Sequence, residues 1–178
     1  IWDEQLGIDQ CFEAWRKWQG KEEPGFWIDM DMIPFGQLQL MSPKPKGVNG
    51  DESKIEIREK QKNGELSDFE LLAGKGWTRQ SRFSKNQMYT FITLRALSAS
   101  PLMMGGDLPS LDDFSHQLIT HKEILCCNQN GVMGNLVYEK ENLESWNTPE
   151  KEESSGWIGV FNRSENELTL PISKEVLG

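Results

Sequence analysis

Apolar residues recur at helical spacing near the start of the chain. They are Ile8, Cys11, Phe12, Trp15 and Trp18. A repeat of three or four positions places them on one face of a helix, which we predict over residues 4–19. Asp3 is placed to cap the N-terminus of this helix, and Gly20 follows its last apolar position and ends the run.

Three more helices are predicted from capping signals. A Ser or Thr followed three residues later by Gln or Glu is typical of a capping box, in which each side chain bonds the other residue's backbone. This pattern occurs twice. A third predicted helix start has Ser and Asp ahead of an apolar run. The predicted helices run from Ser84 (with Gln87) to about residue 98, from Ser110 and Asp113 to about 119, and from Thr120 (with Glu123) to 127.

Strand signals lie between these helices and, more densely, after them. Residues 26–32 form a short apolar run that Pro34 and Gly36 end, and residues 102–104 form a second run. Up to residue 127 helices alternate with strands, which favours an α/β fold with parallel strands and helices outside. The later runs predict an antiparallel module, and they are 132–139, 143–147, 157–162 and 168–172.

A long connection separates the first strand from the next helix. It covers residues 37–80 and contains a turn-rich stretch at 42–47 and a charged run. Connections of this length inside a compact domain are usually functional or mobile. We expect it to act as a lid over a pocket, with residues 55–59 suited to a small hairpin.

Charge and cysteine content exclude several kinds of partner. The 178 residues carry a net charge of −9, and an acidic surface does not suit nucleic acid. No apolar stretch approaches the roughly 20 residues that cross a bilayer. The three cysteines show neither a disulfide framework nor zinc spacing. We therefore predict no nucleic-acid partner, no membrane partner and no cofactor. Seven tryptophans are many for this length, and they suit either a core or a sugar site.

Two carboxylates, Asp29 and Asp31, flank Met30 at the end of the first strand. Side chains alternate along a strand, so both are expected on one face. Three explanations remain open. The pair holds a divalent metal, because hard cations prefer oxygen ligands; or it binds a sugar; or it accepts hydrogen bonds from loop amides.

The second strand ends at Gly105, Gly106 and Asp107. In a parallel sheet or barrel, active sites lie at the C-terminal ends of the strands, so we expect these residues beside the two carboxylates. Two glycines at such a place let a ligand or backbone approach closely. Met32 and its neighbours in the second strand would add soft apolar surface.

Four segments resemble glycoside hydrolase family 27, the α-galactosidases and α-N-acetylgalactosaminidases. The first is similar to that family's Gly-Gly-Trp-Asn-Asp-Pro-Asp-Met segment, and the others follow in the family's order and spacing apart from the longer connection at 37–80. They are GFWIDMDM at 25–32, TFITLRAL at 90–97, SPLMMGGDL at 100–108 and LITHKEILCCNQ at 118–129.

The resemblance implies a fold and a set of domains. Residues 1–129 would be the C-terminal part of a (β/α)8 barrel, with its last two strands and their helices. Residues 130–178 would begin a C-terminal antiparallel β-sandwich. A complete barrel takes roughly 250 residues, so we expect the missing barrel portion or another subunit to complete the fold.

The resemblance also implies an activity, retaining hydrolysis of terminal α-linked galactose-type sugars. It places the family's acid/base aspartate immediately before Ile1 and the nucleophile further upstream. The chain would then contain no catalytic carboxylate and no metal ligand, and alone it would be inactive. Asp31 and Met32 match positions lining the sugar pocket, Asp29 and Trp27 match supporting positions, and Gly105, Gly106 and Asp107 lie behind them.

The chain departs from the family pattern at four positions, Phe26, Ile28, Met30 and Arg95, the last where the family commonly has Trp. These differences leave the preferred sugar open. Two alternatives also remain, a metal-dependent glycosyltransferase using Asp29 and Asp31, and a non-catalytic carbohydrate-binding module. The resemblance favours a secreted, periplasmic or lysosomal location.

Overall fold

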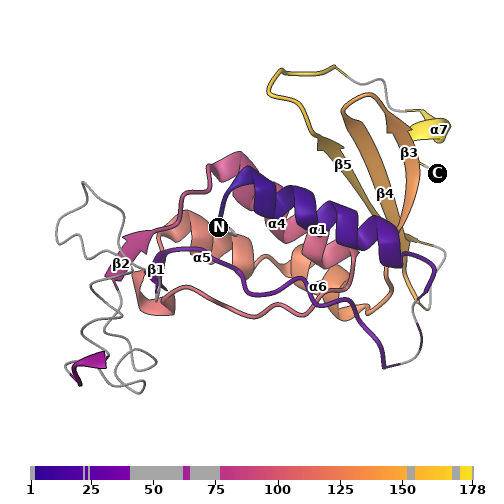
Figure 1. The fold of residues 1–178 in the computed structure, drawn as a ribbon. Helices are drawn as coiled ribbons and strands as arrows, with labels where there is room; N and C mark the ends of the chain where they lie inside the picture. The colour runs from indigo at the N-terminus through magenta and orange to yellow at the C-terminus, as the bar shows by residue number, and fades with distance from the viewer. Residues whose placement is uncertain are drawn as a thin grey trace.

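The computed structural model describes most of the chain and shows a mixed α/β arrangement. Figure 1 shows a group of helices with a sheet at one end and a small two-stranded hairpin at the other. The predictions for residues 42–47 and 55–59, and that of a lid, lie outside the described residues. The described residues are 3–21, 23, 25–40, 62–64, 77–151, 155–169 and 173–177.

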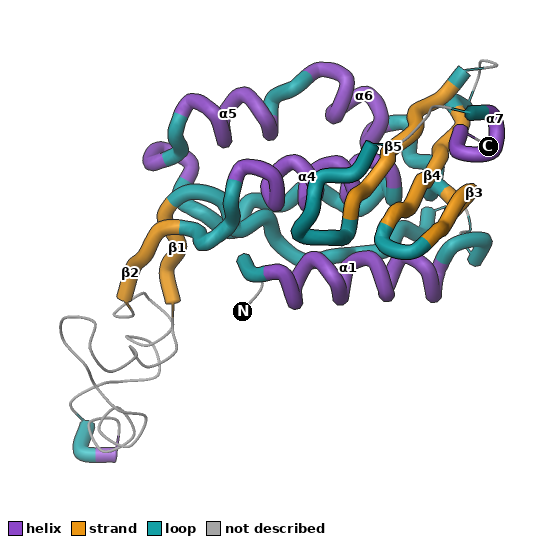
Figure 2. Tube along the Cα trace, turned by 90° about the horizontal axis from the view of Figure 1, so that it is seen from above, coloured by secondary structure: helices purple, strands orange, loops and turns teal. Residues whose placement is uncertain are grey.

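The four predicted helices are present. α5 begins after Asp112, whose carboxylate accepts the Ser115 N–H at 2.7 Å, and not at Ser110 as predicted. Figure 2 shows α1 and the α5–α6 pair on opposite sides of α4, so α4 is the central helix. The helices are α1 (Gln5–Trp18), α4 (Lys85–Leu97), α5 (Asp113–Ile119) and α6 (Lys122–Gln129).

The two predicted capping boxes have different outcomes. The box of α4 is confirmed, because Ser84 Oγ accepts the Gln87 N–H at 3.2 Å and the Ser84 N–H donates to Gln87 Oε1 at 2.9 Å. The box of α6 is wrong. His121 is the N-cap residue there, without a side-chain cap, and the Thr120 hydroxyl donates to the His116 carbonyl at 2.7 Å.

The predicted role of Asp3 is also wrong, since Glu4 holds the N-cap position of α1. Asp3 is buried and accepts both terminal nitrogens of Arg79, one of them at 2.8 Å. It also accepts the Arg82 N–H at 2.8 Å. Asp3 therefore ties the start of α1 to the segment that leads into α4.

The two predicted parallel strands are neighbours, although each is an extended segment and not a full strand. A single parallel bridge joins Ile33 to Met104. The Ile33 N–H donates to the Met103 carbonyl at 2.7 Å, and the Gly105 N–H donates to the Ile33 carbonyl at 3.0 Å. We call residues 28–35 and 100–106 the paired segments. The described residues do not close a barrel.

The two ends of the 37–80 connection pair with each other, which the sequence analysis did not predict. β1 (Gln37–Leu40) and β2 (Trp77–Gln80) form an antiparallel pair. The Asp107 N–H donates to the Gln37 carbonyl at 2.8 Å. The hairpin is therefore joined to the chain just after the second paired segment.

The antiparallel module is confirmed for three of its four predicted strands. Its strand order is β3-β4-β5, with both pairs antiparallel. Of the fourth predicted strand, residues 168–169 are not in a strand and residues 170–172 lie outside the described part. The elements are β3 (Asn135–Lys140), β4 (Leu143–Pro149), β5 (Gly156–Asn162) and the short helix α7 (Lys174–Leu177).

Helices and sheet share one hydrophobic core. The Trp15 and Trp146 rings are stacked with centroids 3.8 Å apart, and Phe12 meets Phe161 edge to face at 5.0 Å. The Trp15 indole N–H donates to the Gly134 carbonyl at 2.8 Å. The packing is continuous across residue 130, and the domain boundary there stays a prediction.

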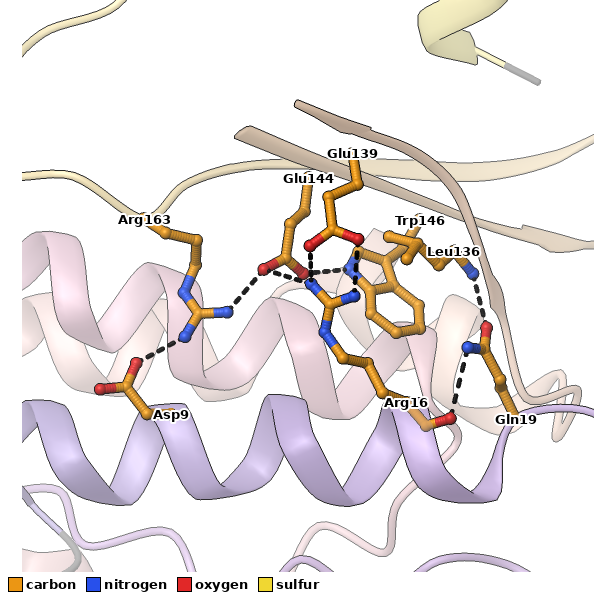
Figure 3. Close-up of polar contacts among 8 residues, drawn as sticks. All are labelled: Asp9, Arg16, Gln19, Leu136, Glu139, Glu144, Trp146 and Arg163. Carbon is orange, nitrogen blue, oxygen red and sulfur yellow. Dashed lines mark hydrogen bonds and ion pairs between the residues drawn. The ribbon is translucent and has the colours of Figure 1, made fainter. Parts of the chain in front are cut away.

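An ionic network lies beside these tryptophans (Figure 3). We call its members, Asp9, Arg16, Glu139, Glu144 and Arg163, the interface network. Glu144 is buried and meets Arg16 and Arg163 at 2.7 Å each. Arg16 also meets Glu139 at 2.9 Å, and Arg163 meets Asp9. The network fastens the sheet to α1.

Candidate functional site

Asp29 and Asp31 form an acidic turn, which we define as residues 29–32. Asp29 Oδ1 accepts the Asp31 N–H at 2.8 Å, and Asp31 Oδ1 accepts the Met32 N–H at 2.7 Å. Asp31 has φ 67°, which is left-handed and cannot continue a strand. The expectation that strand alternation puts both carboxylates on one face is therefore wrong, because the strand is interrupted at Asp31.

Both carboxylates are exposed. Each binds one backbone amide through one oxygen, and the second oxygen has no hydrogen-bond partner within the described residues. A carboxylate has about four lone-pair sites. The acidic turn can therefore accept further hydrogen bonds from a ligand while keeping its own shape.

The backbone between the two carboxylates is held from behind by side chains. The Met30 N–H donates to Ser100 Oγ at 3.1 Å, and the Met30 carbonyl accepts a hydrogen bond from the buried Arg95. The amide of Asn128 holds the Ser100 carbonyl at 2.7 Å. No sequence pattern pointed to Ser100, and Arg95 stood out only as a departure from the family. The available signal was a charged residue within the run Phe91–Leu97, which is otherwise free of charge.

The structure brings Met32 against Gly105 and Phe35 against Gly106. A Cβ added to Gly105 would lie 2.7 Å from Met32 Cβ, and one added to Gly106 would lie 1.7 Å from the Phe35 carbonyl oxygen. Both positions need glycine because the paired segments touch there. Met32, the last residue of the acidic turn, is 51% exposed and offers apolar surface where it meets the second paired segment.

Asp107 follows these glycines on the exposed surface. It is the N-cap residue of a short 3₁₀ helix, Leu108–Ser110, without a side-chain cap. Its carbonyl accepts the Ser110 hydroxyl at 3.0 Å. Its contacts are thus those of a turn residue, and a role behind the sugar site stays a prediction.

Trp27 contacts the segment that follows α6. Its indole N–H donates to the Gly131 carbonyl at 3.3 Å, and it lines a hollow of about 370 Å³ with Phe26, Val132 and others. A supporting role of Trp27 at the sugar site stays a prediction.

A larger hollow lies elsewhere, between α1, α4 and the residues after β5. Its volume is about 820 Å³ and its lining is mostly polar. Several of its side chains already bond one another, as Gln5 does with Asp9 at 3.1 Å and with Gln87 at 3.3 Å. We therefore place the candidate site at the acidic turn.

In the described part of the chain, no group of three or more His, Cys, Asp or Glu side chains could hold a metal ion. Of the helices in that same part, none is long and apolar enough to cross a membrane.

Comparison with known proteins gives partial matches. No protein-family model matches the chain. An α-galactosidase from Cyamopsis tetragonoloba is 34% identical over 85 residues, which cover 47% of this chain and 20% of that protein. The chain therefore spans about a fifth of this curated relative.

Two solved structures share the fold over nearly the whole chain. A family 27 β-L-arabinopyranosidase from Geobacillus stearothermophilus matches with a TM-score of 0.67 and 28% identity, over 93% of this chain and 31% of that one. A variant of it was solved in complex with arabinose. A protein from Bacillus halodurans, described as a candidate α-N-acetylgalactosaminidase, matches with a TM-score of 0.69 and 26% identity, over 100% of this chain and 34% of that one. These matches confirm the resemblance drawn from the four sequence segments.

Proposed function

This chain is related to the family 27 glycoside hydrolases over about a third of their solved length, and from that relation we propose that it forms the sugar-positioning part of a retaining glycosidase. The paired segments would be the last two strands of a (β/α)8 barrel. Residues 130–178 would begin its C-terminal β-sandwich. The substrate would carry a terminal α-linked galactose-type sugar.

The acidic turn is the observation that carries this proposal. It interrupts the first paired segment, and its last residue, Met32, lies against Gly105 near the end of the second one. Barrel enzymes bind substrate at the C-terminal ends of their strands, and the resemblance places this turn there. Its carboxylates keep an oxygen available for sugar hydroxyls. Hydrogen bonds of this kind fix the orientation of the sugar, and orientation is a large part of the rate.

Asp29 and Asp31 do not supply the two catalytic carboxyls. A retaining glycosidase needs a nucleophile and an acid/base about 5–5.5 Å apart on either side of the scissile bond. Here both carboxylates lie on one turn, and each is engaged with a backbone amide. By the resemblance, the catalytic pair belongs to barrel strands that precede the matched third. The chain alone would then bind sugar without hydrolysing it.

The names of the relatives limit the choice of substrate sugar to two similar sugars. One of them acts on α-galactosides by name and another on β-L-arabinopyranosides. These two sugars share the arrangement of their ring hydroxyls and differ by one hydroxymethyl group. We therefore expect the acidic turn to contact the shared hydroxyls, and the hydroxymethyl group to be selected elsewhere.

The test is an assay with nitrophenyl α-galactoside and nitrophenyl β-L-arabinopyranoside in the presence of EDTA. The chain is assayed alone and within a polypeptide that supplies the remaining barrel strands. We expect turnover only from the completed barrel, and Asp31→Ala should lower kcat/KM by about 100-fold. Glu165→Ala, which removes an exposed carboxylate after β5 and not in the predicted sugar site, is the matched control.

Three results would contradict the proposal. Full activity in Asp31→Ala would remove the acidic turn from the sugar site. Activity that EDTA abolishes would favour a metal-dependent glycosyltransferase using the same two aspartates. Binding of sugar by the completed barrel without any turnover would favour a carbohydrate-binding module.

A further inference from the structure

Arg95 is buried beneath the acidic turn without a carboxylate partner. It is 1% exposed and forms no ion pair within the described residues. Its guanidinium donates to the carbonyls of Met30 and Phe91 and lies over the Phe91 ring, 3.4 Å from its centroid. Its Nε has no hydrogen-bond partner in the described part of the chain. Removing such a charge from water is expensive unless it is paired, so its presence calls for a reason.

The charge is retained at neutral pH. Burial lowers the pKa of Arg95 to about 10, and contact with Cys11 and the charges of Asp31 and Asp29 act in the opposite direction. The two carboxylates that act on Arg95 are those of the acidic turn. Because Arg95 is buried and donates to the Met30 carbonyl, its guanidinium lies on the inner side of the turn, whereas both carboxylates are exposed.

We propose that Arg95 is a positioning residue for the acidic turn, and that it suits the turn to a neutral sugar and not to a metal ion. Arg95 holds the Met30 carbonyl while Ser100 holds the Met30 N–H, so the backbone between the two aspartates is fixed on both sides. The left-handed Asp31 is kept in place by this hold. The inference rests on the proposed function for its ligand, and the hold on Met30 rests on geometry alone.

The charge of Arg95 also affects which ligand the turn accepts. Two carboxylates close together repel each other, and a nearby cation relieves that repulsion. A divalent cation would otherwise do this, because hard cations prefer clustered carboxylates. With Arg95 behind the turn, the carboxylates are already compensated, and their remaining oxygens accept hydrogen bonds from neutral hydroxyl groups.

The experiment compares Arg95→Met and Arg95→Lys with a matched control, Arg82→Met, in the 178-residue chain. Arg82 is half exposed and pairs with Glu4 at the surface, so its loss removes an arginine without touching the turn. Amide signals of Asp31 and Met32 in ¹⁵N NMR spectra report the shape of the turn. D-galactose and Mn²⁺ titrations report its ligand, and thermal unfolding reports stability.

We expect Arg95→Met to shift the amide signals of Asp31 and Met32 and to weaken D-galactose binding by about tenfold or more. Added Mn²⁺ should broaden the amide signals of residues 29–32 in this variant and not in the wild type. The unfolding midpoint of Arg95→Met should not fall, because an apolar side chain replaces a buried charge. In Arg95→Lys the amide shifts, the galactose affinity and the Mn²⁺ broadening should lie between those of Arg95→Met and of the wild type. Arg82→Met should match the wild type. A structural role without positioning would lower the midpoint and leave the amide signals in place.

Unchanged Asp31 and Met32 amides in Arg95→Met would overturn the positioning role. Mn²⁺ broadening in the wild-type chain would overturn the ligand preference. If Arg95→Met does not fold, the amides of Arg95→Lys decide, and wild-type positions there count against the proposal. If the wild type binds no galactose, the proposed function fails, while the amide comparison still decides what Arg95 does.

Discussion

Arginine side chains are used differently in two regions of this molecule. In the interface network, Arg16 and Arg163 each reach the buried carboxylate of Glu144 at 2.7 Å and a second carboxylate nearby. Below the acidic turn, Arg95 reaches carbonyl oxygens, the Phe91 ring and Cys11, and forms no ion pair within the described residues. The arginines of the interface network are paired with carboxylates inside the network. Arg95 has no such partner in the described part of the chain, and its charge faces the exposed acidic turn.

The difference separates stability from function. Paired charges next to the stacked Trp15 and Trp146 join two parts of the fold, and removing one partner leaves the other uncompensated. Arg95 adds no such pair, so its removal should affect the geometry of the turn more than the stability of the fold. Stored strain at a residue such as Asp31 is common where a ligand binds. The comparison therefore predicts large losses of stability at the interface and small ones at the turn.

The largest loss should follow from Trp146→Ala at the interface. Trp146 is fully buried, stacks on Trp15 and donates its indole N–H to Glu144 at 2.9 Å. Its removal leaves a cavity, and we expect the free energy of unfolding to fall by about 3–5 kcal/mol. Denaturant unfolding measures this. Trp27→Ala, at a half-exposed side chain, is the control, and equal losses in both variants would contradict the comparison.

A smaller loss is expected from Glu144→Gln. The change keeps the shape of the side chain and leaves Arg16 and Arg163 without their shared charge, which should lower the free energy of unfolding by about 2–4 kcal/mol. Glu139→Gln is the matched control, because Glu139 is 50% exposed and exposed pairs contribute about 1 kcal/mol or less. A double-mutant cycle with Arg163→Met would measure the coupling directly. No coupling would mean that the network is not what fastens the sheet.

The buried pair of Asp3 and Arg79 is a third charged site, and its contribution to stability can be tested by varying the pH. Burial acts to raise the pKa of Asp3, but the hydrogen bonds of Arg79 and of the Arg82 N–H and the charge of Arg79 outweigh it, and the pKa falls from 3.8 to about 2. A lowered pKa contributes stability above the unfolded value that is lost as pH falls through the folded value. We expect Asp3→Asn to cost roughly 2 kcal/mol at neutral pH.

The difference between wild type and Asp3→Asn should disappear as the pH falls from about 4 to about 2. Unfolding by urea at a series of pH values in this window checks the sign. A difference that stays constant with pH would assign the loss to the shape of the side chain and not to its charge.

The smallest change in stability should come from Asp31→Gly. Glycine adopts a positive φ without a steric penalty, and this gain offsets the hydrogen bond lost between Asp31 and the Met32 N–H. We expect the free energy of unfolding to stay within about 1 kcal/mol of the wild type, while galactose binding is lost. Calorimetric titration with galactose and thermal unfolding of the same sample separate the two effects. A large loss of stability would show that the turn is part of the fold's support.

Local signals in the sequence predicted the helices well, because a helix depends on neighbours three and four residues away. Ser84 and Gln87 predicted a capping box that forms. Thr120 and Glu123 carry the same pattern without forming one, since α6 begins after His121 and Thr120 bonds the preceding helix. A pattern alone does not decide which of two adjacent helices a capping side chain serves.

Features that depend on distant parts of the chain were not predictable in this way. The pairing of β1 with β2 joins residues separated by the long connection. The backbone of Met30, next to the left-handed Asp31, is bonded by Arg95 and Ser100, which follow it by more than sixty residues. The alternation of helices and strands did predict Met32 close to Gly105, because the ends of neighbouring parallel strands meet at one edge of a sheet. The roles of these residues in sugar binding still await their test.

The stack of Trp15 on Trp146 should also give the protein a characteristic circular dichroism signal. Two indole rings with centroids 3.8 Å apart and planes 21° from parallel share their excited states, so together they rotate polarised light differently from two separate rings. One ring belongs to α1 and the other to β4. The resulting circular dichroism couplet is an internal optical signal of the contact between helix and sheet, and it vanishes as soon as the sheet separates from α1, before either element has to unfold.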